Sequence, residues 1–205
     1  MRPDVMVFDI GRVLIRWDPE GFYDRTIGPD RRAALFAAVD LHGMNLEIDR
    51  GRGFRSVVED CAAAHPDWHA EIRLWHDCWS QMVPGAIEGS VRLLHALKAA
   101  GVPVLALTNF GRETLQIAQA RFAFLRLFDR MFVSAELGVV KPDPAIYQAV
   151  EAAGYAPGRL LFADDMPENC AAAARRGWHV HPFTGPEALA QALVDHGLLT
   201  KETFP

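Results

Sequence analysis

The chain has 205 residues, of which 50% are hydrophobic, and its formal net charge is −5. At roughly 150 residues per domain, this length predicts little more than one domain, which can bury a core without disulfides. The acidic balance, with no block of basic residues, argues against binding to nucleic acid or to an anionic membrane. The three cysteines are scattered, and the apolar run at the N-terminus is too short for a signal peptide or a membrane span. We therefore expect a soluble protein in the reducing cytoplasm.

Five short apolar segments, rich in β-branched residues and bounded by Gly, Pro, Asp or Asn, have the pattern of strands buried on both faces. They are residues 5–10, 102–108, 130–134, 160–163 and 178–181. Apolar residues recur at helical spacing in 90–100, 113–124, 145–153 and 168–176. Strands that alternate with helices predict an α/β fold with a doubly wound parallel sheet, which binds ligands beyond the carboxyl ends of its strands.

The alternation is interrupted once, between the first and the second predicted strand. Residues 16–89 contain no convincing strand and show helical patterns at 31–39, 54–64 and 67–82. This stretch is too long for an ordinary connection and too apolar for a disordered one. We therefore predict a helical cap at 16–89, inserted into an α/β core made of 1–15 and 90–205.

Polar residues stand at the ends of the predicted strands or ahead of helices. They are Asp9, Thr108, Asn109, Lys141, Asp164 and Asp165. Taken singly, such residues are typical turn formers, helix caps or solvated loop residues. Taken together they would meet at one edge of the sheet, where adjacent acids repel unless a cation lies between them. A carboxylate nucleophile, Mg²⁺ to shield phosphate oxygens, and lysine, hydroxyl and amide donors are what chemistry on a phosphate needs.

The order and context of these residues resemble the four motifs of the haloacid dehalogenase (HAD) superfamily. The matching segments are Phe8-Asp9-Ile10-Gly11-Arg12-Val13-Leu14, Leu107-Thr108-Asn109, Lys141-Pro142, and Phe162-Ala163-Asp164-Asp165 with Asn169. The resemblance covers the whole chain, because the helical insert is similar to the cap that this superfamily carries between its first two motifs. The subgroup that it resembles most contains α-D-glucose-1-phosphate phosphatases and the phosphatase domain of soluble epoxide hydrolases.

The resemblance implies a catalytic role for four residues. Asp9 matches the nucleophile that forms an aspartyl-phosphate, and Lys141 matches the cation that neutralises nucleophile and substrate. Thr108 and Asn109 match the donors to the phosphoryl oxygens, together with backbone N–H groups at the helix start near Gly111.

The resemblance also implies Mg²⁺ as the cofactor. The implied ligands are Asp9, the backbone carbonyl of Gly11, Asp164 and Asp165. The implied reaction is hydrolysis of a small phosphate monoester, such as a sugar phosphate, and we expect a monomer or a homodimer.

One position departs from the commonest pattern of the superfamily. Most of its phosphatases have a second aspartate two residues after the nucleophile, which serves as general acid and base, and this chain has Gly11 there. A glycine carbonyl can bind metal, but it cannot protonate a leaving alkoxide, and such help is typically worth ~10²–10⁴-fold in rate. We therefore expect a slow phosphatase, a replacement acid from the cap, or a substrate with a good leaving group.

Gly11 keeps two alternatives open. The metal-independent 2-haloacid dehalogenases of the superfamily also lack the second aspartate, but they carry Ser and Asn where this chain has Asp164 and Asp165. Paired acids beside a carboxylate nucleophile favour the metal-dependent phosphatase. The other alternative is a catalytically weak binding or regulatory module, and the presence of Asp9, Lys141 and both late acids argues against it.

The cap adds only candidates by analogy, since caps of this superfamily lie over the site. Arg16, Trp17, His42 and Asn45 are the candidates for substrate contact, and His42 is also a candidate source of the missing proton. Gly51-Arg52-Gly53 predicts a turn rather than a phosphate loop, because no strand precedes it.

Overall fold

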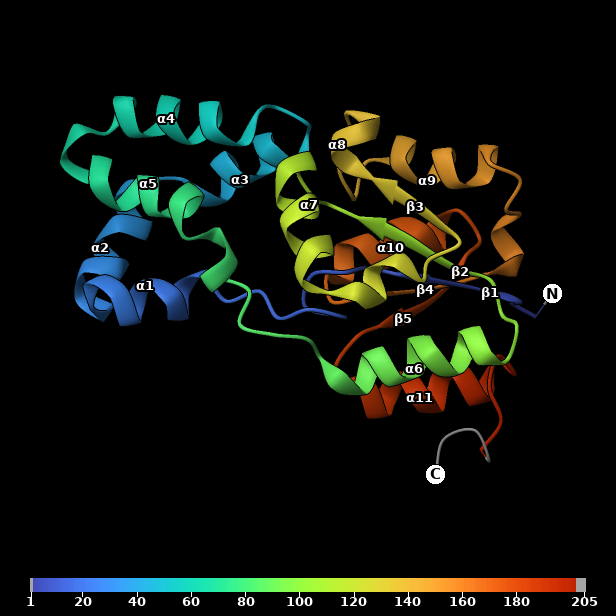
Figure 1. The fold of residues 1–205 in the computed structure, drawn as a ribbon. Coiled ribbons are helices and arrows are strands. Elements are labelled where there is room, and N and C mark those ends of the chain that lie inside the picture. Colours follow the sequence, from blue (N-terminus) through green and yellow to red (C-terminus); the bar gives the residue numbers. More distant parts are fainter. Residues whose placement is uncertain (1, 202–205) are drawn as a thin grey trace.

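Five parallel strands form the centre of the fold in the computed structural model, which describes residues 2–201 (Figure 1). They are β1 (Val5–Phe8), β2 (Val104–Thr108), β3 (Arg130–Val133), β4 (Leu160–Asp164) and β5 (His179–Pro182). The order across the sheet is β3-β2-β1-β4-β5, and every neighbouring pair is parallel. All five predicted strands are present, and the predicted doubly wound α/β fold is confirmed.

Helices cover both faces of the sheet. The helices that pack on the sheet include α6 (Glu88–Ala99), α9 (Pro144–Ala152), α10 (Pro167–Arg175) and α11 (Pro186–Asp195). In β1, Met6 and Phe8 belong to the apolar cluster with α6 and α11, while Val5 and Val7 belong to the cluster with α9 and α10. These four side chains are at most 1% exposed, and each contributes about 1.5–3 kcal/mol by its burial. Burial on both faces explains why the strand segments are almost continuously apolar.

The predicted helical region lies between β1 and β2. It contains α1 (Pro19–Ile27), α2 (Pro29–Ala38), α3 (Leu41–Asp49), α4 (Phe54–Ala64) and α5 (His69–Asp77), with 3₁₀ turns at Pro66–Trp68 and Trp79–Gln81. The predicted segments 31–39, 54–64 and 67–82 correspond to α2, α4 and α5. The last segment is interrupted because the backbone leaves helical geometry at Cys78, with φ −122° and ψ 16°. The helices α1 and α3 were not predicted.

Both unpredicted helices begin with an aspartate cap rather than with a clear apolar stripe. Asp18 Oδ1 accepts a hydrogen bond from Gly21 N at 2.9 Å, and Asp40 Oδ1 accepts one from Gly43 N at 2.7 Å. Such a cap satisfies a backbone N–H that the first helical turn leaves unpaired. The glycine in each first turn lowers helix propensity, so periodicity alone does not reveal these two helices.

The chain enters and leaves the helical region through two paired segments. Arg16 N donates to Gly85 O at 2.8 Å, and a β-bridge joins Ile15 to Ala86. Figure 1 shows the two segments crossing together from the sheet to the helices. The division into a core of 1–15 and 90–205 and a cap of 16–89 stays a prediction, and this paired connection lies close to its boundaries.

The remaining helices are α7 (Arg112–Arg121) and α8 (Ser134–Leu137), with 3₁₀ turns at Ala123–Arg126 and Pro157–Arg159. The helix predicted at 113–124 ends early, at Arg121, because Phe122 has an extended backbone with φ −118° and ψ 93°. A turn between α3 and α4 is present at Arg50 and Gly51, so it begins one residue before the predicted turn at Gly51-Arg52-Gly53. Within residues 2–201, no helix is both long and apolar enough to cross a membrane.

Candidate active site

The carboxyl ends of the strands carry the residues that the sequence singles out. Asp9 directly follows β1, Thr108 ends β2 and Asp164 ends β4. The chain runs from β1 through β2 to β3 on one side and then returns to β4 on the other side of β1. The loops after β1 and β4 therefore diverge, which leaves room for a ligand at this edge of the sheet.

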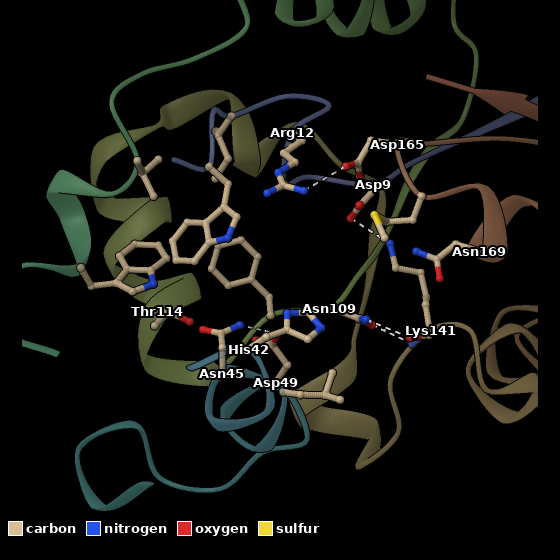
Figure 2. A pocket seen from close by; sticks show the side chains of 18 residues that line it. Asp9, Arg12, His42, Asn45, Asp49, Asn109, Thr114, Lys141, Asp165 and Asn169 are labelled. Atoms are coloured by element: carbon tan, nitrogen blue, oxygen red, sulfur yellow. Dashed lines mark hydrogen bonds and ion pairs between the residues drawn. The ribbon is translucent and has the colours of Figure 1, made fainter. Parts of the chain in front are cut away.

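Lys141, in the loop ahead of α9, joins the carboxyl groups of Asp9 and Asp164, and Figure 2 shows its contact with Asp9. Its Nζ lies 2.9 Å from Asp9 Oδ1, and it donates to Asp164 Oδ2 at 2.6 Å and to Leu107 O at 3.0 Å. These contacts use the three protons of the ammonium group. Because Lys141 is only 4% exposed, buried partners rather than water compensate its charge.

The two buried charges influence each other's protonation. Burial raises the pKa of Asp9 to about 7, and the ammonium of Lys141 opposes that rise. Burial also disfavours the charged form of Lys141, but the carboxylates of Asp9 and Asp164 outweigh it and raise its pKa above the usual value. Lys141 is therefore cationic at neutral pH, and it is the charge that favours a carboxylate at Asp9.

Asn109 fixes the backbone of Lys141. Its Oδ1 accepts a hydrogen bond from Lys141 N at 2.7 Å, and its Nδ2 donates to Lys141 O at 3.1 Å. This pair ties the end of β2 to the loop ahead of α9, and so determines where the ammonium lies. The contact of Asn109 with a phosphoryl oxygen stays a prediction, for which one amide proton remains.

The hydroxyl of Thr108 is buried without a hydrogen bond. The residue is 1% exposed, and its Oγ1 has no partner in the described part of the chain. An unpaired buried hydroxyl costs about 1–3 kcal/mol, and such a group is typical of a site where a ligand oxygen completes the pair. Its role as a donor to a phosphoryl oxygen stays a prediction.

Three carboxyl groups come together at the predicted metal site. One oxygen each from Asp9, Asp164 and Asp165 lie within 4.8 Å of one another. Asp164 is fully buried, and its Oδ1 accepts hydrogen bonds from Met166 N at 2.8 Å and from Asn169 Nδ2 at 2.9 Å. Burial and the charge of Asp164 raise the pKa of Asp165, which shows that the acids repel one another. A divalent cation would relieve this repulsion, and carboxylate oxygens are the ligands that Mg²⁺ prefers, so the donor set fits the cofactor.

A cavity of about 210 Å³ lies between this edge of the sheet and the helical region. On the sheet side its lining includes Asp9, Gly11, Arg12, Asn109, Lys141 and Asp165. On the helical side its lining includes Trp17, His42, Asn45, Asp49 and Trp79. Three of the four cap candidates for substrate contact therefore face the cavity. Arg16 does not, because its Nη1 donates instead to Ala86 O at 2.6 Å.

Gly11 leaves the cavity open beside the nucleophile. A Cβ at Gly11 would meet no other atom within 4 Å, so a longer side chain has room there. The next residue, Arg12, has a left-handed backbone with φ 56°, and its Nη1 lies 3.8 Å from Asp165 Oδ2. No sequence pattern distinguishes Arg12 from an ordinary surface arginine, and it was not predicted as a site residue.

Asp49 is a second unpredicted residue of the site, at the end of α3. It is 9% exposed, and its Oδ2 accepts a hydrogen bond from Asn45 Nδ2 at 2.9 Å. Burial raises the pKa of Asp49 to about 7, the backbone N–H of Gly111 opposes the rise, and the charge of Asp9 adds to it. The N–H of Gly111 itself faces Asp49, while the contact of backbone N–H groups near Gly111 with phosphate stays a prediction. Apolar periodicity does not mark α3 as a helix, so the sequence contains no signal that places Asp49 at the site.

Replacing Asp49 with asparagine is expected to remove a pH dependence of stability. Between pH 4 and 7 the folded state keeps a proton on Asp49 that the unfolded state releases. The free energy of unfolding of the wild type should therefore fall as the pH rises through this range, by up to about 4 kcal/mol. Urea unfolding of both proteins in EDTA at pH 4.5 and pH 8 measures the difference. Equal changes in the two proteins would contradict a protonated, buried Asp49.

The family comparison establishes the class of protein. A model of the haloacid dehalogenase-like hydrolases matches residues 25–177, which is more than half of the chain. The chain belongs to this family. The resemblance of the four motifs is thereby confirmed for the HAD superfamily, and the phosphatase subgroup stays a prediction.

Solved structures with the same fold cover nearly all of this HAD hydrolase. A HAD family enzyme from Bacteroides thetaiotaomicron is 21% identical, with a TM-score of 0.72, over 94% of this chain and 99% of that chain. The same enzyme has been solved in complex with magnesium and inorganic phosphate. A HAD family hydrolase from Deinococcus radiodurans R1, with bound phosphate and sodium, is 24% identical, with a TM-score of 0.68, over 97% and 98%. The L-2-haloacid dehalogenase from Xanthobacter autotrophicus, with chloropropionic acid covalently bound, is 19% identical, with a TM-score of 0.62, over 98% and 86%.

Proposed function

We propose that this HAD hydrolase is a Mg²⁺-dependent phosphatase that cleaves small phosphate monoesters through an aspartyl-phosphate. The observation that supports this most is the position of Asp9, which lines the cavity beside the buried ammonium of Lys141 and within a group of three carboxyl groups. A carboxylate beside fixed positive charge can attack phosphorus, because its repulsion from the phosphate is offset. The phosphate bound in the Deinococcus relative, and the magnesium and phosphate bound in the Bacteroides relative, support the same chemistry.

The proposed reaction has two steps. An Oδ of Asp9 attacks phosphorus, and the bond from phosphorus to the leaving oxygen breaks, which gives an aspartyl-phosphate and an alkoxide that takes up a proton. Water then attacks the same phosphorus and gives up a proton, and the bond to Asp9 breaks, which restores the carboxylate and releases phosphate. Lys141 offsets the charge that gathers on the phosphoryl oxygens, and the hydroxyl of Thr108 and the amide of Asn109 donate hydrogen bonds to them.

The residues that would hold Mg²⁺ are Asp9, the carbonyl of Gly11, Asp164 and Asp165. The bound ion supplies positive charge beside the phosphoryl oxygens. Asp164 has the least freedom of the three acids, because both of its oxygens already accept hydrogen bonds. Asp164 therefore also holds the ammonium of Lys141 in place.

Sugar phosphates are the substrate class that we favour. A cavity of about 210 Å³ has room for a small leaving group, and Trp17, His42 and Asn45 offer it an aromatic face and hydrogen-bonding groups. The resemblance to the α-D-glucose-1-phosphate phosphatases supports the same class. A cytoplasmic location and a monomeric or homodimeric state belong to this proposal.

A metal-independent 2-haloacid dehalogenase is the second candidate, and Gly11 is the observation that favours it. The dehalogenase from Xanthobacter autotrophicus shares the fold. A 2-haloacid carries its own carboxylate, however, and in this cavity it would meet the grouped acids Asp9, Asp164 and Asp165. Four negative charges in one site are unfavourable without a metal ion, so the phosphatase is the stronger candidate.

Removing divalent metal is expected to abolish the proposed activity. Phosphate release from p-nitrophenyl phosphate and a panel of sugar phosphates should require Mg²⁺ and fall by at least about 100-fold in excess EDTA, since the ion contributes several kcal/mol. Asp165→Asn should raise the Mg²⁺ concentration needed for half-maximal rate, while Glu168→Gln, at an exposed acid on α10, should not. Full hydrolysis in EDTA would contradict the metal requirement, and cleavage of the C–Cl bond of a 2-haloacid without metal would support the dehalogenase.

A further inference from the structure

Asp49 is a carboxyl group to which the reaction described above gives no part. It lines the cavity although the residue is only 9% exposed. Its carboxyl group is held by Asn45 Nδ2 at 2.9 Å and faces the backbone N–H of Gly111 at the start of α7. Its backbone is fixed as well, since Ser134 Oγ, at the start of α8, donates to Asp49 O at 2.6 Å. Contacts from α3 and from the start of α7 hold the carboxyl group, and a contact from α8 holds the backbone that carries it, so the orientation is fixed as a catalytic group requires.

Asp49 places a carboxyl group in the cavity that lacks the second aspartate, because Gly11 stands at that position. His42, Asn45 and Asp49 are three and four residues apart on α3, so they share one helix face. Figure 2 shows these side chains at one side of the cavity and Arg12 and Asp165 at the other. A phosphate ester bound at the strand edge would direct its leaving group away from the nucleophile, towards the helical side of the cavity.

We propose that Asp49 donates the proton to the leaving oxygen and then accepts a proton from the attacking water. This inference rests on the proposed phosphatase function. In the first step, the proton moves from an Oδ of Asp49 to the leaving oxygen as its bond to phosphorus breaks, which yields an alcohol and an Asp49 carboxylate. In the second step, water passes a proton to that carboxylate as its oxygen bonds to phosphorus. The electron pair of the bond that breaks returns to Asp9, so both carboxyl groups regain their starting states.

The other titratable groups of the described cavity lining are less suited to this task. Lys141 is bound to two carboxylates, and the guanidinium of Arg12 lies 3.8 Å from Asp165 on the opposite side of the cavity from Asp49. Asp165 belongs to the group of acids that would hold the metal. His42, the cap residue considered from the sequence, is exposed in the first turn of α3. Asp49 combines a place in the cavity with burial and a fixed orientation.

The electrostatic surroundings of Asp49 suit a proton donor at neutral pH. A general acid works best when its pKa lies near the working pH, and burial raises the pKa of Asp49 to about 7. The charged groups that act on it are Asp9 after β1, which adds to the rise, and Lys141 ahead of α9, which opposes it. The helices α7 and α8 face it with the neutral N–H of Gly111 and the hydroxyl of Ser134.

A series of phosphate monoesters with leaving groups of different basicity tests the proposal. In the wild type, log kcat/KM should depend weakly on the pKa of the leaving group. Asp49→Asn should lower kcat/KM by ~10²–10⁴-fold for alkyl and sugar phosphates and by less than about 10-fold for 2,4-dinitrophenyl phosphate, whose phenolate leaves without a proton. Glu47→Gln is the matched control, because it makes the same chemical change on α3 at a residue outside the cavity lining. It should leave the series unchanged.

A second test places an aspartate at position 11, where this chain has glycine. Because a Cβ at Gly11 meets no atom within 4 Å, Gly11→Asp has room for its side chain. Added to Asp49→Asn, it should recover at least about 10-fold of the lost rate on alkyl phosphates. A merely structural role of Asp49 would not be repaired from the other side of the cavity.

The wild-type protein gives a readout that does not depend on folding of the variants. Above about pH 7, kcat/KM for an alkyl phosphate should fall relative to kcat/KM for 2,4-dinitrophenyl phosphate, because only the first needs a protonated Asp49. Equal pH profiles, a loss in Asp49→Asn that is the same for every leaving group, or no loss at all would each overturn the proposal. The proposed function is judged separately, by whether the wild type releases phosphate from any ester of the series.

Discussion

Replacing Asp9 with asparagine is expected to lower kcat by on the order of 10⁴-fold or more, because an amide cannot displace the leaving group from phosphorus. The protein should remain folded, since Lys141 keeps its contacts with Asp164 at 2.6 Å and with Leu107 O at 3.0 Å. Initial rates with p-nitrophenyl phosphate and a urea unfolding curve measure the two effects, and mass spectrometry excludes deamidation of the new asparagine.

Asp4→Asn is the matched control for this experiment. Asp4 directly precedes β1 as Asp9 directly follows it, but Asp4 is exposed and pairs with Arg159 at 2.8 Å. Loss of such a surface ion pair costs about 0–1 kcal/mol and should leave the rate unchanged. Beryllium fluoride, which mimics a phosphoryl group on Asp9, should inhibit the wild type and bind the Asp9→Asn variant poorly. Substantial turnover by Asp9→Asn would remove Asp9 from the role of nucleophile.

The α/β core could be predicted because its strands are buried on both faces. Segments 5–8 and 104–107 are continuous apolar runs, and each is followed by a polar residue at the sheet edge. The topology then brings Asp9 and Asp164 together without any further information. The order of the strands and their burial are therefore enough to predict that Asp9 and Asp164 lie close together.

The separate roles of Thr108 and Asn109 depend on the directions of their side chains, which the sequence motif does not specify. Thr108 and Asn109 are adjacent, and successive side chains of an extended chain point to opposite sides. Accordingly the hydroxyl of Thr108 is buried without a partner, while the amide of Asn109 binds the backbone of Lys141. A prediction that treats both as equivalent donors overlooks this alternation.

Asp49 could not be predicted from the same reasoning. It lies on α3, a helix that periodicity does not reveal, and nothing near it in the sequence marks it as chemical. It reaches the cavity only because α3 packs beside α7 and α8, where Gly111 and Ser134 hold it. Contacts between the helical region and the core are set by tertiary packing, and one sequence contains little information about them.

Replacing Lys141 with methionine is expected to lower the free energy of unfolding at pH 7.5 in EDTA by about 3–5 kcal/mol, because it leaves buried carboxylates without their cation. Asp9 and Asp164 lie 2.9 Å and 2.6 Å from the ammonium, and the side chain of Lys141 is 1% exposed. The rate should fall by ~10²–10³-fold as well, since a donor to the developing charge is lost. Urea unfolding measures the first effect, and kcat with p-nitrophenyl phosphate measures the second.

The pH dependence of the loss in stability distinguishes the contribution of the charge of Lys141 from that of its packing. Without the ammonium, the pKa of Asp9 in the folded state should rise further, because burial and the charge of Asp164 are no longer opposed. The folded variant then binds protons more tightly than the unfolded chain, so its deficit in stability should shrink as the pH falls from 7.5 to 5. Lys98→Met, at a lysine whose side chain is 31% exposed and lies 2.5 Å from Asp129, is the matched control and should cost no more than about 1 kcal/mol at either pH. A deficit for Lys141→Met that is the same at both pH values would show that lost packing, rather than uncompensated charge, destabilises the variant.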